Sequence, residues 1–309
     1  MKIISQAPTR ISLFGGGTDV NPYASTYGGV VFNMAINIRQ HIELTDSSNE
    51  WIMPQLAVSG FYIPFFEKFK VHTLLGMKAV SDSVIESGLG SSASAAVALI
   101  GALAKFKKVK LTKQEIAEMA WDIEVNKLGM YSGKQDQYAA VYGGINLMEF
   151  KDKVTVTQLS PAFVDFMIPY MILFHTGNNR KSSKIQDGFK ELSENQILAL
   201  DEIKKVTFEG IDAVSNKDID RVGRLLDFMW DLKKKSNKGV SNDKIDKIYK
   251  EGISTGAYGG KILGAGGGGH IIFICPPAKQ SKLKEKMLKM GCTWKDFSID
   301  YNGLETRVI

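Results

Sequence analysis

The sequence is poor in cysteine, in proline and in long apolar runs. Its 309 residues include two cysteines, Cys275 and Cys292, and eight prolines. Two cysteines without ligand spacing around them exclude a disulfide framework and a zinc-finger site. The longest apolar run, at residues 95–104, is well short of a membrane span, and the first residues lack the apolar core of a signal peptide. We therefore expect a reduced, cytoplasmic protein with no membrane partner.

The charge balance is basic, but its pattern does not indicate nucleic-acid binding. The net charge is +6, and lysine runs at residues 105–110 and 233–238 are typical of solvated surface. No zinc-finger, RNA-recognition or helix-turn-helix signature accompanies the charge. Phosphorylated small molecules are therefore the anions that we expect this protein to bind, and the sequence leaves its oligomeric state open.

The first half of the chain has the pattern of a sheet followed by helices. Alternating β-rich runs begin the chain, and helical spacing starts at Ser91, with Thr112 and Glu115 forming a capping box ahead of a second helix. A hairpin and a further strand then precede a boundary near Pro169. The expected strands are at residues 11–14, 30–38, 41–45, 144–150, 154–159 and 170–175.

The second half has a helical pattern between residues 190 and 254, interrupted at 236–241, which predicts three helices. Two expected strands at residues 271–275 and 293–299 then flank a helix at 279–290. These patterns predict an α+β protein with two lobes, divided into residues 1–168 and 169–309.

Three glycine-rich segments are the most informative feature. They read RISLFGGGTD at residues 10–19, GLGSSA at 88–93 and GAGGGG at 264–269. The middle segment leads directly into the helix at Ser91, so its backbone N–H groups and the positive end of a helix dipole coincide, which favours an anion. A Walker motif is excluded because no Lys-Ser or Lys-Thr follows at the required distance, and the last segment runs into a strand, which excludes a dinucleotide fold there.

In this order and at these distances, the three segments resemble the motifs of the GHMP kinase superfamily, named for galactokinase, homoserine kinase, mevalonate kinase and phosphomevalonate kinase. The resemblance spans nearly the whole chain and implies an ATP-dependent phosphotransferase that binds nucleotide and sugar between two lobes. It implies that the middle and last segments hold the nucleotide. The residues concerned are Gly88, Leu89, Gly90, Ser91, Ser92, Ala93, Gly266 and Gly267.

The resemblance also implies the catalytic and metal-binding residues. Asp136 lies in a segment, SGKQDQ, that is similar to the one carrying the catalytic aspartate of sugar kinases, and Arg10 takes the place of the motif's basic residue. Ser92 and Glu124 are the implied ligands of Mg²⁺, which prefers hard oxygen ligands. The spacing from Glu124 to Asp136 is one residue longer than in mevalonate kinase-like members, and the alternative is an exposed acid on an amphipathic helix.

The implied acceptor is a sugar. Where galactokinase has Gly-Glu-His-Thr-Asp, this chain has glycines at 16 and 17 followed by Thr18 and Asp19, a carboxylate that can accept bonds from two sugar hydroxyls. We expect these four residues and Gly133 to contact the sugar. Together with the segment at residues 176–183, the motifs most resemble those of the D-glycero-D-manno-heptose 7-phosphate kinases, which phosphorylate the anomeric O1 for nucleotide-activated heptose and surface polysaccharide synthesis.

Such an acceptor already carries a phosphate, and Arg180 and Lys181 are the candidates to bind it. The alternative is that they form a solvated basic loop. Two other functions remain open from the sequence: a kinase of an unphosphorylated sugar such as fucose, and a non-catalytic sensor that binds ATP and sugar. The four histidines, His41, His72, His175 and His270, show no ligand spacing, and we interpret them as structural.

Overall fold

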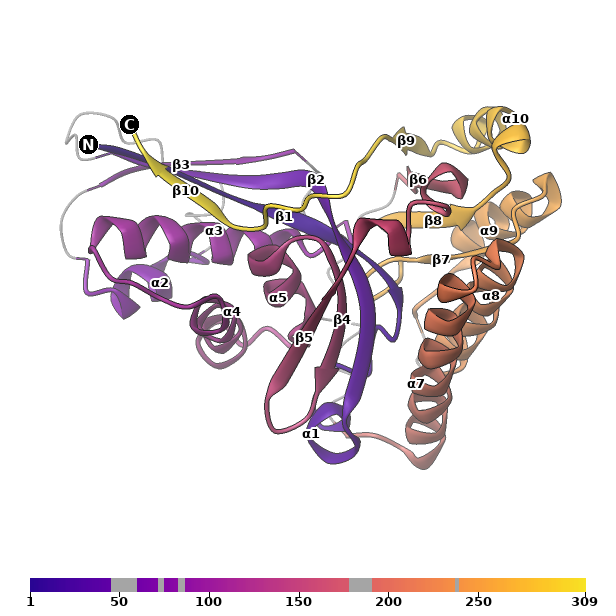
Figure 1. Ribbon diagram of the computed structural model, residues 1–309, viewed down its shortest axis with the longest axis horizontal. Helices are drawn as coiled ribbons and strands as arrows, with labels where there is room; N and C mark the ends of the chain where they lie inside the picture. Colours follow the sequence, from indigo (N-terminus) through magenta and orange to yellow (C-terminus); the bar gives the residue numbers. More distant parts are fainter. Residues whose placement is uncertain (46–59, 72–74, 83–86, 178–190, 237–238) are drawn as a thin grey trace.

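The computed structural model has two antiparallel sheets with helices packed against them, which confirms the expected α+β architecture (Figure 1). It describes residues 1–45, 60–71, 75–82, 87–177, 191–236 and 239–309. Among the helices of these segments, none combines the length and the apolar character needed to cross a bilayer.

The first sheet is built on two long strands, β1 and β2. Its strand order is β10-β1-β2-β4-β5, and β3 pairs with residues 40–45 at the C-terminal end of β2. Along β1 burial alternates up to Gln6, whereas residues 7–14 are almost fully buried, because helices cover both faces there. The strands are β1 (Lys2–Phe14), β2 (Gly29–Thr45), β3 (Gly76–Ser81), β4 (Ile145–Phe150), β5 (Val154–Leu159) and β10 (Glu305–Val308).

Helix α3 (Ser91–Phe106) lies against β1 and β2 and is buried along most of its length. Its small residues allow a close approach: a Cβ at Gly101 would be 2.8 Å from Ser5 Oγ. The capping box of Thr112 and Glu115 is confirmed at the start of the next helix, α4. The other helices of this half are α1 (Tyr23–Tyr27), α2 (Ile63–Lys68), α4 (Lys113–Asp122), the π-helical turn η1 (Ile123–Lys127) and α5 (Gln135–Tyr142).

The second sheet has the order β7-β8-β6-β9 and is joined to the first by two short 3-10 turns, η2 (Pro161–Phe163) and η3 (Ile168–Tyr170). The three helices expected between residues 190 and 254 are present, but the strand expected at 293–299 ends at Lys295. The elements are β6 (Met171–His175), α7 (Glu194–Ser215), α8 (Ile219–Ser236), α9 (Asp243–Thr255), β7 (Gly259–Ile262), β8 (His270–Ile274), α10 (Pro277–Lys289) and β9 (Thr293–Lys295).

The two halves are closely joined. The chain end returns to the first sheet, where β10 pairs with β1, as the yellow strand in Figure 1 shows. One hydrophobic cluster also contains Ile11 of β1, Leu226 of α8 and Ile272 of β8. The expected division at residues 168 and 169 separates the two sheets except for β10, and as a domain boundary it stays a prediction.

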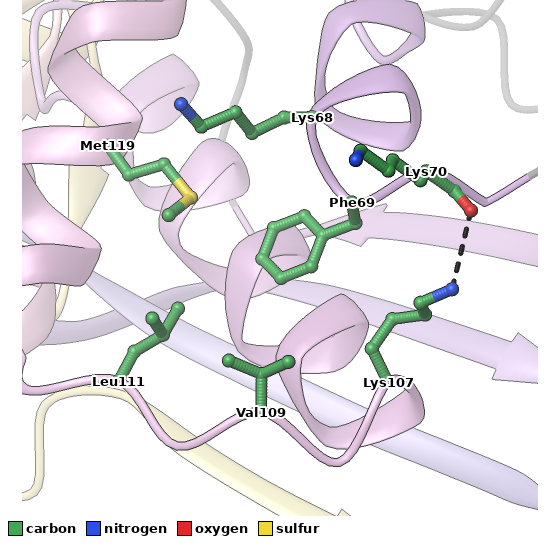
Figure 2. Close-up of a pocket in the computed structure, with 7 residues that line it drawn as sticks. All are labelled: Lys68, Phe69, Lys70, Lys107, Val109, Leu111 and Met119. Atoms are coloured by element: carbon green, nitrogen blue, oxygen red, sulfur yellow. Dashed lines mark hydrogen bonds between the residues drawn. The ribbon is translucent and has the colours of Figure 1, made fainter.

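A cavity of about 230 Å³ lies beside the C-terminal end of α3 (Figure 2). An α-helix rises 1.5 Å per residue, so the 16 residues of α3 place this cavity roughly 24 Å from the glycine-rich segment at its start. The cavity therefore lies outside the region where the glycine-rich segments meet. Its lining residues are Lys68, Phe69, Lys70, Lys107, Val109, Leu111 and Met119.

Candidate active site

The three glycine-rich segments come together between the two sheets. The backbone N–H of Arg10 donates to Leu89 O at 3.0 Å, which joins the first segment to the second. The N–H of His270, next to the last segment, donates to Ser87 O at 2.9 Å. Segments that lie far apart in sequence thus form one continuous backbone surface.

Glycine is required where the second and third segments touch. Gly88 and Gly264 both have positive φ, +84° and +69°, which favours glycine. A Cβ at Gly88 would lie 2.5 Å from Leu263 O, and one at Gly264 would lie 2.7 Å from Gly88 Cα. The packing of these two backbones explains why part of each motif must be glycine.

Arg10 and Asp136 form a close ion pair at this junction. Arg10 Nε and Nη2 lie 2.7 and 2.6 Å from Asp136 Oδ1, and Nη1 donates to Gly88 O at 2.7 Å. Register shifts between β1 and β2 flank Arg10 on both sides, and such bulges alter where a side chain points. Asp136 Oδ2 lies beside Gly90, 3.0 Å from where a Cβ would be. The two predicted catalytic residues therefore meet next to the middle segment.

The first turn of α5 connects three acids. Successive helical residues point in different directions, so Gln135, Asp136 and Gln137 reach different partners. Gln135 Nε2 donates to Asp19 Oδ1 at 3.0 Å, and Gln137 Nε2 donates to Glu124 Oε2 at 2.6 Å. One helical turn thereby positions Asp19, Asp136 and Glu124 relative to one another.

Asp19 is buried and held by amide donors. The backbone N–H of Gly17 donates to its Oδ1 at 3.1 Å, and that of Gln135 donates to its Oδ2 at 3.2 Å. Burial raises the pKa of Asp19, and the charge of nearby Asp136 adds to this effect. A Cβ at Gly133 would lie 2.0 Å from Asp19 Oδ2, so Gly133 leaves room for this carboxylate.

The neighbouring residues of the first segment shape its loop. The Thr18 hydroxyl is fully buried and lies 2.8 and 2.9 Å from Gly15 O and Val30 O, either of which can accept its one proton. Its geometry fits a role in positioning the loop. Gly16 packs against Ser12, while a Cβ at Gly17, which has φ +107°, would lie 3.6 Å from Leu200 Cδ2.

Glu124 is buried in contact with Ser92. It is 1% exposed, which excludes the exposed acid of the alternative interpretation. It accepts hydrogen bonds from Gln137 and Ser92, yet burial raises its pKa to about 7. Between Glu124 and Asp136 the chain forms the π-helical turn η1, where Leu128 N donates to Ile123 O at 3.0 Å, and such a turn holds one residue more than an α-helical turn.

These residues fit a divalent cation bound together with nucleotide phosphates. A hydroxyl and a buried carboxylate are hard oxygen donors, and Mg²⁺ in nucleotide sites takes few protein ligands, the rest being phosphate oxygens and water. In the described part of the chain, no group of three or more His, Cys, Asp or Glu side chains is placed to hold a metal ion.

The start of α3 presents backbone N–H groups toward this acid cluster. Gly90, at the N-cap with φ +78°, has no side chain to cap the helix. Leu89 and Ala93 are buried in the core, so their backbone is what a ligand would meet. At the last segment, Gly266 packs on Val240, and the N–H of Gly267 donates to Val240 O at 2.6 Å.

Models of two families match the chain: the GHMP kinases N terminal domain at residues 59–144 and the GHMP kinases C terminal domain at residues 211–291. A D-glycero-alpha-D-manno-heptose 7-phosphate kinase of Campylobacter jejuni is 30% identical, with 99% of each chain covered. The chain belongs to the GHMP kinases.

More distant relatives share the fold. A mevalonate kinase of Pyrococcus furiosus is 26% identical over 99% of this chain and 98% of its own. The crystal structure of a D-glycero-D-manno-heptose 1-phosphate kinase of Bacteroides thetaiotaomicron superposes with a TM-score of 0.80 at 24% identity, covering 99% of each chain. Like its family, this GHMP kinase is an ATP-dependent phosphotransferase whose acceptor is an alcohol. Family membership therefore favours an enzyme over the alternative of a non-catalytic sensor that binds ATP and sugar.

Some predicted residues of this GHMP kinase are not in the described part. Arg180, Lys181 and His72 lie outside the described residues. Of the other histidines, His175 and His270 are buried cross-strand partners in β6 and β8, with ring centroids 5.0 Å apart. Their packing agrees with a structural role.

Sequence reasoning missed four polar residues of the site. Gln135 and Gln137 flank Asp136, and their position in the motif was the available signal. Lys233 was interpreted as part of a solvated run, but it is only partly exposed, and its Nζ donates to Gly264 O. Lys261 is 2% exposed, and its Nζ donates to Leu13 O at 3.0 Å.

Proposed function

We propose that this sugar kinase of the GHMP family phosphorylates the anomeric O1 of D-glycero-D-manno-heptose 7-phosphate, giving the 1,7-bisphosphate for nucleotide-activated heptose and surface polysaccharide synthesis. The observation that carries the proposal is the Arg10–Asp136 pair beside the glycine-rich start of α3. The choice of acceptor is supported by the full-length similarity to the heptose 7-phosphate kinase of Campylobacter jejuni. The cytoplasm is the expected compartment.

In the proposed reaction, Asp136 is the general base. It takes the proton of the acceptor hydroxyl as the oxygen forms a bond to the γ-phosphorus of ATP and the bond to the β-phosphate oxygen breaks, releasing ADP. Phosphoryl transfer depends mainly on positioning and charge stabilisation. Arg10, fixed by Gly88 O, orients the Asp136 carboxylate and places positive charge beside the acceptor oxygen.

The other residues bind and orient the two substrates. Asp19 is the proposed anchor for sugar hydroxyls, in a loop shaped by Gly16, Gly17 and Thr18 and closed by Gly133. Backbone N–H groups of residues 88–93 bind ATP phosphates, assisted by Gly266 and Gly267. Ser92 and Glu124 would hold Mg²⁺, which neutralises phosphate charge when bound. For the 7-phosphate of the acceptor, Arg180 and Lys181 stay the predicted ligands.

The test is an ADP-release assay with Mg²⁺ and a panel of acceptors: the heptose 7-phosphate, mannose 6-phosphate, fucose and galactose. Selective turnover of the heptose phosphate, with phosphorus NMR showing a new anomeric phosphate, is the expected result. Turnover of a neutral sugar alone would replace this acceptor by one of the fucose type. As a check on the phosphate ligands, Arg180→Ala should raise the KM for the acceptor far more than that for ATP.

A further inference from the structure

Helix α8 brings a lysine to the junction of the glycine-rich segments. α8 packs against β7 and reaches β1, and its last turn contains Lys233, Lys234 and Lys235. Lys235 is exposed, whereas Lys233 extends to the carbonyl of Gly264. The three neighbours thus differ in surroundings although they share one helical turn.

Two cations bind the backbone of this junction. Arg10 Nη1 donates to Gly88 O, and Lys233 Nζ donates to Gly264 O. Gly88 and Gly264 are in backbone contact, because a Cβ on Gly264 would lie 2.7 Å from Gly88 Cα. The guanidinium of the first half, which is paired with Asp136, and the ammonium of the second half therefore bind the carbonyls of two glycines that touch each other.

Three basic side chains lie close to one another at this junction. Burial, and then the charge of Arg10, lower the pKa of Lys233 to about 8, while Asp19 opposes this effect. Lys261 of β7 also lies close enough to Lys233 and Arg10 for their charges to lower its pKa. Asp136 and Asp19 offset part of this positive charge, and the junction would also stabilise the negative charge of a bound phosphoryl group.

We propose that Lys233 is a further catalytic residue of this kinase, which binds the phosphoryl group while it passes from ATP to the acceptor. Lys233 Nζ lies where the two glycine-rich segments meet, and an ammonium is a compact point charge that suits a phosphoryl oxygen. The transferred phosphoryl group is the ligand proposed for it, because Lys233 donates to Gly264 next to the nucleotide segment and is close enough to Arg10 for their charges to interact. The proposal rests on the phosphotransferase activity and is independent of which sugar is the acceptor.

The test compares Lys233→Met with Lys233→Arg and with the matched control Lys235→Met, which removes a charge from the same helical turn. We expect Lys233→Met to lower kcat about 100-fold, the loss typical of removing one donor to a developing charge, with KM for ATP and acceptor changed less than about threefold. Lys233→Arg should recover most of the activity, and Lys235→Met should behave as the wild type. Thermal unfolding of each variant identifies a loss that comes from misfolding.

A binding measurement decides the role without turnover. Mg·ADP with aluminium fluoride mimics the transferred phosphoryl group, and calorimetry should show that Lys233→Met binds it more weakly while binding Mg·ADP as the wild type does. Equal affinity of the two proteins for the fluoride complex would overturn the proposal, as would an effect confined to the KM for the acceptor. If no sugar of the panel is turned over, the proposed acceptor fails, and this measurement still decides the role of Lys233.

Discussion

The two halves of the molecule contribute different side chains to the site. The first half supplies the acids Asp19, Glu124 and Asp136, each hydrogen-bonded by a side chain of that half. The second half supplies Lys233 and Lys261, each donating to a backbone carbonyl. In the proposed function the first half thus supplies the acids and Arg10, and the second half adds basic side chains at the same junction. Each prediction below changes one side of this comparison.

The largest loss of activity is expected when an acid of the first half, Asp136, is changed. Asp136→Asn keeps the size of the side chain but removes the base and the charge that faces Arg10. General-base catalysis typically contributes about 10²–10⁴ in rate, so we expect a loss of kcat of that order with ATP affinity unchanged. Steady-state kinetics and a nucleotide-binding assay check this. Asp152→Asn, in the exposed turn between β4 and β5, is the control, and full activity of Asp136→Asn would contradict the assignment.

A second prediction tests the position of the Asp136 carboxylate without removing any charge from either half. In Gly90→Ala the new Cβ would lie 3.0–3.2 Å from the Asp136 carboxylate, and displacing a catalytic group by about 1 Å costs up to about 100-fold in rate. Gly129→Ala is the matched control, because Gly129 also has positive φ, +65°, but among the described residues no atom lies within 4 Å of where its Cβ would be. Both variants should lose about 1–2 kcal/mol of stability through backbone strain.

The measurement for this pair is kcat alongside the free energy of unfolding in urea. Equal kcat values for Gly90→Ala and Gly129→Ala would show that the position of Asp136 does not depend on the space that Gly90 leaves.

The smallest effect is expected from the buried cation of the second half. Burial lowers the pKa of Lys261 well below 10.5, so at pH values between the lowered value and 10.5 the unfolded chain binds a proton that the folded protein lacks. The contribution of Lys261 to the free energy of unfolding therefore rises with pH, by at most about 1.4 kcal/mol per pH unit. Lys261→Met should remove this rise in denaturation measured between about pH 7 and 10.

Lys250→Met, on the exposed side of α9, is the control for that measurement. Its pH dependence should match that of the wild type. If the free energy of unfolding of Lys261→Met rises with pH as steeply as that of the wild type, Lys261 carries its proton in the folded protein. The second half would then bring a second positive charge to the site.

The features predicted well from the sequence are those with local signals. The capping box of Thr112 and Glu115 depends on contacts within one helical turn, and the hairpin of β4 and β5 depends on alternation and a short turn. The helix that begins at Ser91 follows from its spacing of small apolar residues. In each case the residues that decide the structure are neighbours in the chain.

Features that depend on distant contacts were missed or left open. The lysine run at residues 233–238 has the composition of a solvated surface, and the packing of α8 on β7 brings Lys233 to the carbonyl of Gly264. Glu124 had two interpretations until the fold buried it beside Ser92. The return of β10 to the first sheet has no local pattern, because pairing with β1 joins residues about 300 positions apart.

By itself, the sequence determined the family, the three glycine-rich segments, and the residue types that can carry phosphoryl transfer. The reason is that these features are local. A backbone conformation with positive φ favours glycine at that one residue, and an anion site at the start of a helix depends on a few residues that are neighbours in the chain. The tertiary structure alone decided which charges meet, since electrostatic interactions depend on distance in space and on burial. It brought Arg10 to Asp136, Ser92 to Glu124, and a lysine of the second half to the same junction.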